Sequence, residues 1–355
     1  MFARKKAANK IPNLDDPSLA RVRLTPQLLD YDHFAKRAHS QYLPYVMSFN
    51  PSNYSSTAIN TDSLGFRIAH NKDGDPVSVG TLNSVASGEA VSLLVGASPS
   101  LGYGSTSDAT SVVSRLAASD PENSTWLNFA GHCYNSVQEL MLFILHQHRV
   151  KNIRRIVVMG GFNTLVMARL PEFSRGGLPP FYFCGEYFEK FDEIAVANGG
   201  NPPIARLPSW PSETISIPPI SETLAQATLE IMNTITTWKA LADSLGAQLD
   251  FLQQPLATWV RDPCAEEKTL FDELNQISRL GTWDKLYGDI SGEDVGERFG
   301  SMLGEGCNQQ GVRFDSLVPA LRNRPPTDWL FVDRAHFTDH GNDVVANAIL
   351  SSIHN

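Results

Sequence analysis

The sequence has little cysteine and no long apolar run. It has only four cysteines, which are scattered and form no CxxC pair: Cys133, Cys184, Cys264 and Cys307. This number and spacing exclude a disulfide framework and favour a reducing, cytoplasmic compartment. No stretch approaches the roughly 20 apolar residues that span a bilayer, and the basic start MFARKKAANK has no apolar segment behind it. We therefore expect neither stable membrane insertion nor a secretory signal.

Positive charge is also scarce. The chain of 355 residues has 29 Lys and Arg against 38 Asp and Glu, a formal net charge of -9, which argues against nucleic acid as the main partner. No lysine follows the glycines of GYGSTSD (102–108) where a phosphate-binding loop needs one. With 42% hydrophobic and 19% charged residues, and no internal repeat, the composition instead predicts a folded globular protein.

Strand and helix patterns alternate from residue 89 onward. Short apolar strands are expected at 91–95, 125–130, 154–161, 247–255 and 328–333. Helices are expected at 110–118, 136–148, 221–246 and in the closing DHGNDVVANAILSSI. This alternation predicts an α/β fold, with a mostly parallel five-stranded sheet and helices on both faces.

Three regions depart from the alternation. Residues 1–88 have few long apolar runs, so we expect a small N-terminal subdomain or wrapping segment before the α/β domain of 89–355. Two insertions interrupt that domain: a Pro- and Gly-rich one at about 170–219, too long for a simple connection, and a largely helical one at about 256–326. The aromatic residues of the first insertion are expected either to line an acyl pocket or to form its own small core. They are Phe181, Tyr182, Phe183, Tyr187, Phe188 and Trp210.

Four polar residues fall at or just past the ends of expected strands: Ser98, Asn163, Asp333 and His336. In parallel sheets the ligand crevice lies beyond those carboxyl ends. A serine hydroxyl needs a base in contact with it, and the base needs a partner that holds its tautomer. Asp333 and His336 are three residues apart, so one loop can present both, with His336 as the base. For Ser98 or Asn163 taken alone, an ordinary turn residue is the simpler interpretation.

Four motifs accompany these residues in order. They are VGASPSLGYG (95–104), NFAGHCYNSVQEL (128–140), GGFNTL (160–165) and DRAH (333–336). In their order and separation they resemble the four blocks of the SGNH (GDSL-type) hydrolases, and the resemblance extends from residue 91 to the C-terminus. One such motif is a weak signal, whereas four in register are a strong one. INTDSLGFR (59–67) also resembles an N-terminal segment of many bacterial members.

The resemblance implies a flavodoxin-like three-layer sandwich and a catalytic triad in which Ser98 attacks, His336 is the base and Asp333 orients it. It also implies three oxyanion donors. These are the backbone N–H of Ser98, the side-chain amide of Asn163 and an N–H of the second block. The usual glycine of that block falls on Cys133, and Gly131 is the alternative.

Other interpretations of these residues remain open. The usual aspartate after the third-block asparagine is Thr164 here, which leaves the key amide in place. Cys133 as a second nucleophile is a possibility, although a small apolar residue is the simpler account. A metal site is a further alternative, which we do not expect because its acids suit the first turns of a helix; it would use His336, Asp339, His340 and Asp343.

The sequence therefore predicts a serine-dependent hydrolase of a small-molecule or glycan ester that forms an acyl-enzyme and needs no cofactor or metal. The first alternative is an O-acyltransferase with the same site, acting in small-molecule or glycan biosynthesis. The second is a non-catalytic binding or regulatory protein on a hydrolase scaffold. Substrate identity and oligomeric state are open, because specificity comes from the insertions.

Overall fold

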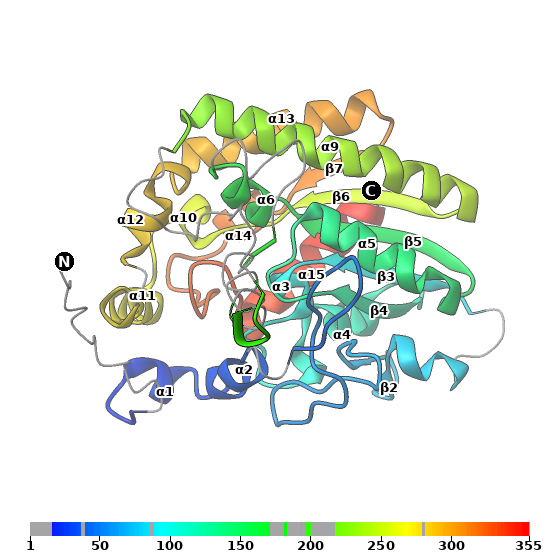
Figure 1. Cartoon of the computed structure of the whole chain (residues 1–355), viewed down its shortest axis with the longest axis horizontal. Helices are drawn as coiled ribbons and strands as arrows, with labels where there is room; N and C mark the ends of the chain where they lie inside the picture. Colours follow the sequence, from blue (N-terminus) through cyan, green and yellow to red (C-terminus); the bar gives the residue numbers. More distant parts are fainter. Residues whose placement is uncertain are drawn as a thin grey trace.

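A computed structural model describes most of the chain. The described residues are 16–36, 40–84, 89–170, 181–182, 193, 196–200, 217–278 and 281–354. At the centre is a five-stranded sheet in the order β4-β3-β5-β6-β7, with every neighbouring pair parallel (Figure 1). Its strands are β3 (Val91–Gly96), β4 (Thr125–Ala130), β5 (Ile153–Gly160), β6 (Gln248–Gln253) and β7 (Arg313–Ser316). The predicted α/β fold is confirmed, and this 2-1-3-4-5 order is the flavodoxin-like one.

The first three strands in the chain, β3, β4 and β5, end together at one edge of the sheet. β3 is buried along its whole length, as its apolar run requires for a strand covered on both faces. Its last residue, Gly96, lies opposite Ala130 of β4 and Met159 of β5. The segments that follow the three strands therefore start side by side, which brings the first three sequence motifs to the same edge of the sheet.

Helices cover both faces of the sheet. On one face lie α5 (Ser136–His146), α9 (Ile220–Leu245) and α13 (Glu293–Gln309), packed against one another through α9. On the other lie α4 (Val112–Ser119) and α15 (Asp339–His354), which contact each other (Figure 1). Among the described residues, the loops between these elements also hold the short helices α3 (Ser98–Leu101), α6 (Phe162–Met167), α10 (Ala257–Val260), α12 (Trp283–Tyr287) and α14 (Val318–Arg322), and the longer α11 (Ala265–Ile277). Short 3₁₀ turns are at Val79–Ser84, Asp108–Thr110, Gln147–Arg149 and Gly288–Ile290.

The fifth strand is not where the sequence predicts it. Residues 328–333 form no strand of the sheet, and only an isolated bridge joins Phe331 to Phe337. The apolar run is buried in a loop whose N–H groups find partners outside the sheet. Val332 donates to the His336 carbonyl oxygen, and Leu330 and Phe331 donate to the Glu267 carboxylate. The fifth strand is β7, within the second insertion, which pairs only with β6. Its sequence, RFDS, has a single apolar residue, so periodicity alone does not reveal it.

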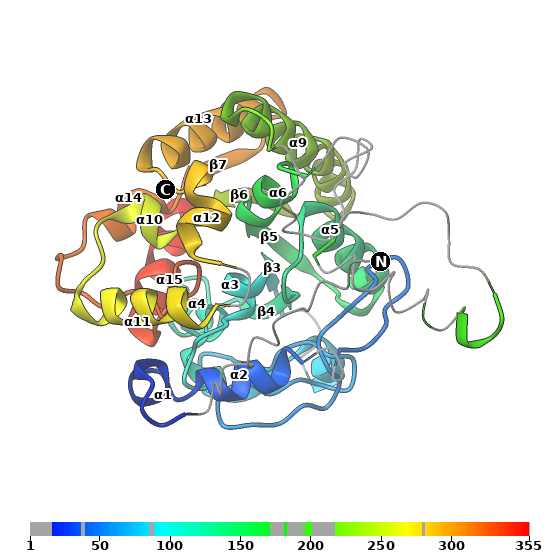
Figure 2. The same cartoon turned by 60° about the vertical axis from the view of Figure 1, so that its left-hand side comes forward.

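The N-terminal segment packs along the β4 side of the molecule. It contains α1 (Ala20–Leu24), α2 (Leu28–Phe34) and a two-stranded antiparallel sheet of β1 (Ala69–His70) and β2 (Pro76–Val77). β1 contacts α4 and β4, and α1 lies beside α11 (Figure 2). The domain boundary near residue 88 stays a prediction, because residues 85–88 lie outside the described residues.

Most of the first insertion lies outside the described residues. Of its six aromatic residues only Phe181 and Tyr182 are described, and Tyr182 packs against the main core. The described cysteines, Cys133, Cys264 and Cys307, are free thiols. Within the described ranges, no helix is both long and apolar enough to cross a membrane.

Candidate active site

Ser98 begins α3 directly after the turn that ends β3, and its side chain is 7% exposed. The turn depends on Gly96, whose φ of +156° is rare for residues with a side chain. A Cβ at Gly96 would also collide with the Ser100 hydroxyl and the Met159 carbonyl oxygen of β5. The glycine therefore lets the chain leave the sheet closely packed against β5, and the serine hydroxyl comes to the sheet edge.

The loop 333–336 brings an imidazole and a carboxylate to that hydroxyl. His336 Nε2 lies 2.7 Å from Ser98 Oγ, and His336 Nδ1 lies 2.7 Å from Asp333 Oδ2. The other Asp333 oxygen accepts the backbone N–H groups of Ala335 and His336 at 2.8 and 2.9 Å. Residues 238 positions apart thus form one chain of hydrogen bonds from carboxylate to hydroxyl.

The electrostatics of the loop favour an ionised carboxylate. Burial opposes ionisation of Asp333, but the charge and hydrogen bond of His336, with the two backbone N–H groups, outweigh it and hold the Asp333 pKa below its usual value. An ionised Asp333 accepts the proton-bearing Nδ1, which leaves the lone pair of His336 Nε2 facing the serine. This is the tautomer that a general base needs.

Two further aromatic side chains support the imidazole. The Tyr103 ring packs on His336 with ring centroids 4.5 Å apart, and it stacks on His132 at 5.6 Å. Burial, with the nearby His336, lowers the pKa of His132 to about 4, so His132 is neutral at pH 7. Both residues lie within the first two motifs, but the sequence analysis gives neither of them a role. The GYG after the serine is the only sequence signal for Tyr103.

The second motif places a free backbone donor near the serine turn. Cys133 adopts φ +61°, the left-handed conformation that glycine favours. Within the described residues, the N–H groups of Cys133 and Ser98 have no hydrogen-bond acceptor, whereas the Gly131 N–H donates to the Gly96 carbonyl oxygen at 3.2 Å. Of the two candidates in this block, Cys133 is therefore the one with an available N–H. Burial raises the pKa of its thiol to about 12, which disfavours the thiolate that a nucleophile requires.

The third motif holds its asparagine against the second. Asn163 lies in the first turn of α6 and donates from Nδ2 to the Tyr134 carbonyl oxygen at 2.7 Å. An amide nitrogen carries two hydrogens, so this contact fixes the side chain and leaves one donor for another oxygen. The hydroxyl of Thr164, which replaces the usual aspartate, accepts the Ser136 N–H at 3.1 Å and links α6 to α5.

The segment INTDSLGFR fastens the serine turn from outside the sheet. Its Arg67 is fully buried and donates to the Leu101 and Gly102 carbonyl oxygens, at 3.0 and 2.7 Å. The same guanidinium pairs with Asp108 at 3.0 Å and donates to the Tyr31 hydroxyl and to the Ala58 and Ser107 carbonyl oxygens. Arg67 therefore ties the chain that follows Ser98 to the N-terminal segment.

A buried carboxylate fastens the histidine loop in a comparable way. Glu267 of α11 is 1% exposed, and its Oε1 accepts the Leu330 and Phe331 N–H groups at 2.8 and 3.1 Å. Its Oε2 accepts the Cys264 N–H at 2.9 Å and pairs with Arg261 at 3.0 Å. The motifs alone do not reveal Glu267, because α11 lies in the insertion outside them.

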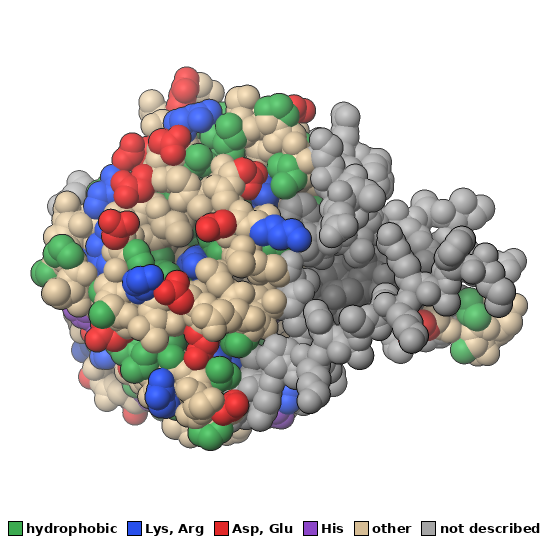
Figure 3. Space-filling view, turned by 90° about the vertical axis from the view of Figure 1, so that its left-hand side faces the viewer, with side chains coloured by type: hydrophobic (Ala, Val, Ile, Leu, Met, Phe, Trp, Pro, Cys, Tyr) green, Lys and Arg blue, Asp and Glu red, His purple; other side chains and the backbone are tan. Residues whose placement is uncertain are grey.

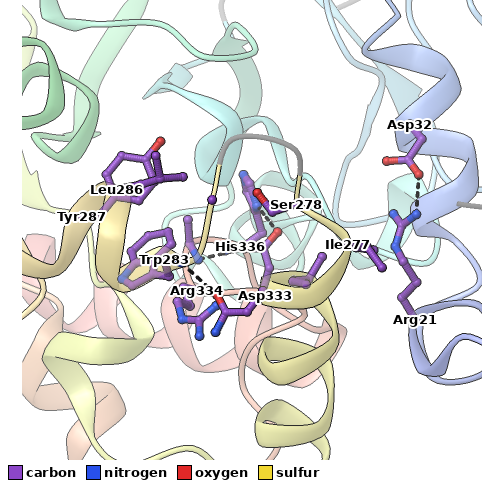
Figure 4. Close-up of a pocket in the computed structure, with 14 residues that line it drawn as sticks. Arg21, Asp32, Ile277, Ser278, Trp283, Leu286, Tyr287, Asp333, Arg334 and His336 are labelled. Atoms are coloured by element: carbon purple, nitrogen blue, oxygen red, sulfur yellow. Dashed lines mark hydrogen bonds and ion pairs between the residues drawn. The ribbon is translucent and has the colours of Figure 1, made fainter. Parts of the chain in front are cut away.

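A pocket of about 510 Å³ opens beside the histidine. It lies between α11, α12 and the loop 333–336, on the side of the molecule that Figure 3 faces, where acidic and basic side chains are interspersed. Figure 4 shows Asp333 and His336 among its lining residues. Much of the wall is apolar or aromatic: Leu274, Ile277, Trp283, Leu286 and Tyr287. The pocket thus provides space next to the imidazole for part of a bound molecule.

The residues of the alternative metal site have separate partners. His340 contacts Asp328 at 3.1 Å, Asp339 accepts the Thr106 N–H at 2.9 Å, and Asp343 pairs with Arg115 at 2.9 Å. In the described part of the chain, the group with metal-compatible spacing is a different one: Asp120, Glu122 and His354. Its acids are already engaged, because Asp120 accepts the Trp126 indole N–H and Glu122 pairs with Arg154.

The sheet order and the placement of the first three blocks at its carboxyl edge agree with the resemblance stated from sequence. The fold is SGNH hydrolase-like. In it, the Ser98 turn follows the first strand of the sheet in the chain, and the Asp333–His336 loop precedes the last helix.

Comparisons with known proteins give matches among solved structures only. No family model and no curated protein sequence matches the chain. An extracellular lipase from Streptomyces rimosus is 13% identical with a TM-score of 0.42, covering 74% of this chain and 99% of the lipase. A lipase/acylhydrolase from Enterococcus faecalis is 12% identical, TM-score 0.40, covering 75% and 95%. A GDSL-like lipase from Bacteroides thetaiotaomicron is 10% identical, TM-score 0.38, covering 75% and 88%.

Proposed function

We propose that the protein is a serine-dependent hydrolase of an ester, with Ser98 as nucleophile, His336 as general base and Asp333 as its orienting partner. The observation that carries this proposal is the chain of hydrogen bonds from Asp333 through His336 to Ser98, with both side-chain contacts at 2.7 Å. An isolated hydroxyl at a turn needs no such chain, whereas a nucleophilic serine does.

In the first half of the reaction, Ser98 Oγ attacks the ester carbonyl carbon while its proton passes to His336 Nε2. The carbonyl oxygen becomes an oxyanion, which the N–H groups of Ser98 and Cys133 and the Asn163 amide stabilise. The intermediate then collapses to an acyl-serine, and His336 gives its proton to the departing alcohol oxygen. Asp333 stays ionised throughout and stabilises the imidazolium.

In the second half, water replaces the alcohol. His336 Nε2 takes a proton from the water as its oxygen attacks the acyl carbon, and the same donors hold the second oxyanion. Collapse of this intermediate releases the carboxylic acid, and Ser98 Oγ recovers its proton from His336. The contact of the Tyr103 ring with the imidazole favours the ring orientation that both steps need.

Replacing the nucleophile tests the proposal. Ser98→Ala is expected to lower turnover of p-nitrophenyl acetate by about 10³-fold or more and to abolish labelling by a fluorophosphonate probe. Ser221→Ala, at an exposed position on α9, is the matched control and should keep both activities. Undiminished labelling of Ser98→Ala would contradict the proposal, as would an unlabelled but well-folded wild-type protein.

A second candidate keeps the site and changes the acceptor. The pocket beside His336 is large enough to hold an alcohol in place of water, which favours an O-acyltransferase as the alternative. Product analysis with candidate sugars and other alcohols separates the two functions, because transfer gives a new ester and hydrolysis gives the free acid. A non-catalytic protein on this scaffold is the remaining alternative, and the labelling experiment tests it directly.

A further inference from the structure

The pocket lies on the histidine side of the candidate site. Its lining includes Asp333, Ala335 and His336, and none of the proposed oxyanion donors is part of it. In the proposed mechanism the departing alcohol oxygen takes its proton from His336 Nε2, so the alcohol part of the ester is the part that lies on this side. The side chains of the pocket therefore contact the alcohol part of the ester, and the acyl part lies elsewhere.

One of those side chains is a cation that has no carboxylate partner in the part of the chain that the structure describes. Arg334 lies between Asp333 and His336 in sequence and is half-buried in the pocket wall. Its guanidinium is stacked on Phe271, 4.8 Å from the ring centroid, and on Trp283, at 5.4 Å. Figure 4 shows Arg334 beside Trp283. Among the described residues, the only hydrogen bond of the guanidinium is a long one of 3.5 Å to the Phe271 carbonyl oxygen, and the guanidinium forms no ion pair.

The acids around Arg334 do not neutralise it by direct contact. Asp333 uses its oxygens on His336 and two backbone N–H groups, and Asp272 pairs with Lys268 at 2.9 Å. The negative charge of Asp284 acts on Arg334 through space and favours its protonated form, but the two form no ion pair within the described residues. Burial lowers the pKa of Arg334 from its usual value, but a guanidinium remains protonated at pH 7. Its donors are thus charged and mostly unused.

The second cation of the pocket is already paired. Arg21 contacts Asp32 at 2.7 Å on the N-terminal side of the pocket, and Figure 4 draws this pair apart from Arg334 and Trp283. An arginine that is paired with a carboxylate contributes little net charge to a ligand site. An arginine without such a partner presents the paired N–H donors of its planar guanidinium, which fit the oxygens of a carboxylate or phosphate.

We infer that the substrate is an ester whose alcohol part carries an anionic group, a carboxylate or a phosphate, and that Arg334 binds that group while the aromatic wall contacts the adjoining apolar or ring atoms. This inference rests on the proposed function. It adds a specificity-determining residue next to the base and names the chemical class of the substrate.

Matched acetate esters test the inference with the full-length protein. The anionic ester is 3-acetoxybenzoate, the neutral one of the same shape is 3-acetoxybenzamide, and 3-acetoxyphenyl phosphate distinguishes a phosphate site from a carboxylate site. We expect kcat/KM of the wild-type protein to be about tenfold higher for one or both anionic esters, mainly through KM, because a hydrogen bond to a charged group is worth about that much. Higher ionic strength should reduce the preference.

Variants assign the preference to its residue. Arg334→Gln is expected to bring the anionic-to-neutral ratio close to one, and Arg334→Lys to retain part of it. Arg154→Gln is the matched control: it removes an exposed arginine at the start of β5, at the opposite end of the strand from the site, and should keep the wild-type ratio. An equal loss with both esters in Arg334→Gln would assign the residue to packing against Phe271 and Trp283 and would overturn the inference.

The wild-type protein alone can also overturn it. If it hydrolyses the neutral ester with no preference for either anionic ester, the inference is wrong while the proposed function stands. If it hydrolyses no aryl acetate and takes no fluorophosphonate label, the proposed function itself fails. A preference for the acyl-side anion of 4-nitrophenyl hydrogen glutarate over 4-nitrophenyl pentanoate, without one for the acetoxy esters, would place the anion on the wrong side and contradict the assignment to the alcohol.

Discussion

The serine turn and the histidine loop are held in opposite ways. The turn is nearly closed to solvent, with Ser98 7% exposed, and the Arg67 guanidinium donates to its carbonyl oxygens. The loop is more open, with side-chain exposures of 16% for His336 and 24% for Asp333, and the Glu267 carboxylate accepts its backbone N–H groups. A buried cation fastens one half of the site and a buried anion the other.

Both fastening residues lie outside the sheet and its motifs. Arg67 comes from INTDSLGFR of the N-terminal segment, and Glu267 comes from the second insertion. The serine turn and the histidine loop differ in solvent exposure, and we infer different roles for them from this difference. The closed serine turn positions a group that every substrate meets, whereas the open loop adjoins the pocket in which substrates differ. We therefore expect changes in the N-terminal segment to affect catalysis of every substrate. Changes in the second insertion should affect both catalysis and substrate specificity.

The largest expected effect comes from breaking the serine side. Arg67→Met removes the guanidinium and leaves Asp108 buried without its partner, so the free energy of unfolding should fall by about 3–5 kcal/mol. The labelling rate of the remaining folded protein should fall too, because the Leu101 and Gly102 carbonyl oxygens each lose a charged donor. Urea denaturation and fluorophosphonate labelling measure the two effects. Arg154→Met, at an exposed ion pair, is the control, and an equally small effect in both variants would contradict the role of Arg67.

A smaller effect is expected on the histidine side. Glu267→Gln keeps an acceptor oxygen but removes the negative charge that pairs with Arg261 and accepts the loop N–H groups. The free energy of unfolding should therefore fall by about 1–3 kcal/mol. Denaturant unfolding of Glu267→Gln, compared with that of Glu266→Gln, measures this loss of stability. Glu266 is an exposed neighbour on α11, so its variant is the control. If the two variants unfold at the same denaturant concentration, the loop is held by other contacts.

The smallest effect concerns the second motif. Cys133→Gly relieves a left-handed conformation that costs a side chain about 1 kcal/mol, so it should be more stable than Cys133→Ala by about that amount. Both variants should keep ester turnover, because the proposed donor is the backbone N–H. Thermal denaturation and p-nitrophenyl acetate hydrolysis measure the two. Loss of turnover in both would instead favour a role for the thiol.

Much of this arrangement is predictable from local sequence. Four of the five strands and the closing helix follow from apolar runs and periodicity, since a buried parallel strand needs apolar residues on both faces. Ser98 and Asn163 follow from their places just after β3 and β5, because carboxyl ends of parallel strands meet at one edge. Asp333 and His336 follow from motif order alone. The prediction of a strand at 328–333 is wrong because burial in a loop produces the same apolar run as burial in a sheet.

What the sequence by itself determined is the α/β alternation and the set of polar groups at the strand ends, because both depend on residues close together in the chain. The tertiary structure decided which edge strand completes the sheet, that the Gly131 N–H is engaged while the Cys133 N–H is free, and which charges fasten the two halves of the site. It also left Arg334 without a carboxylate partner in the described chain. These features depend on distance in space and on desolvation, and a buried charge acquires its partners only when segments far apart in sequence pack together.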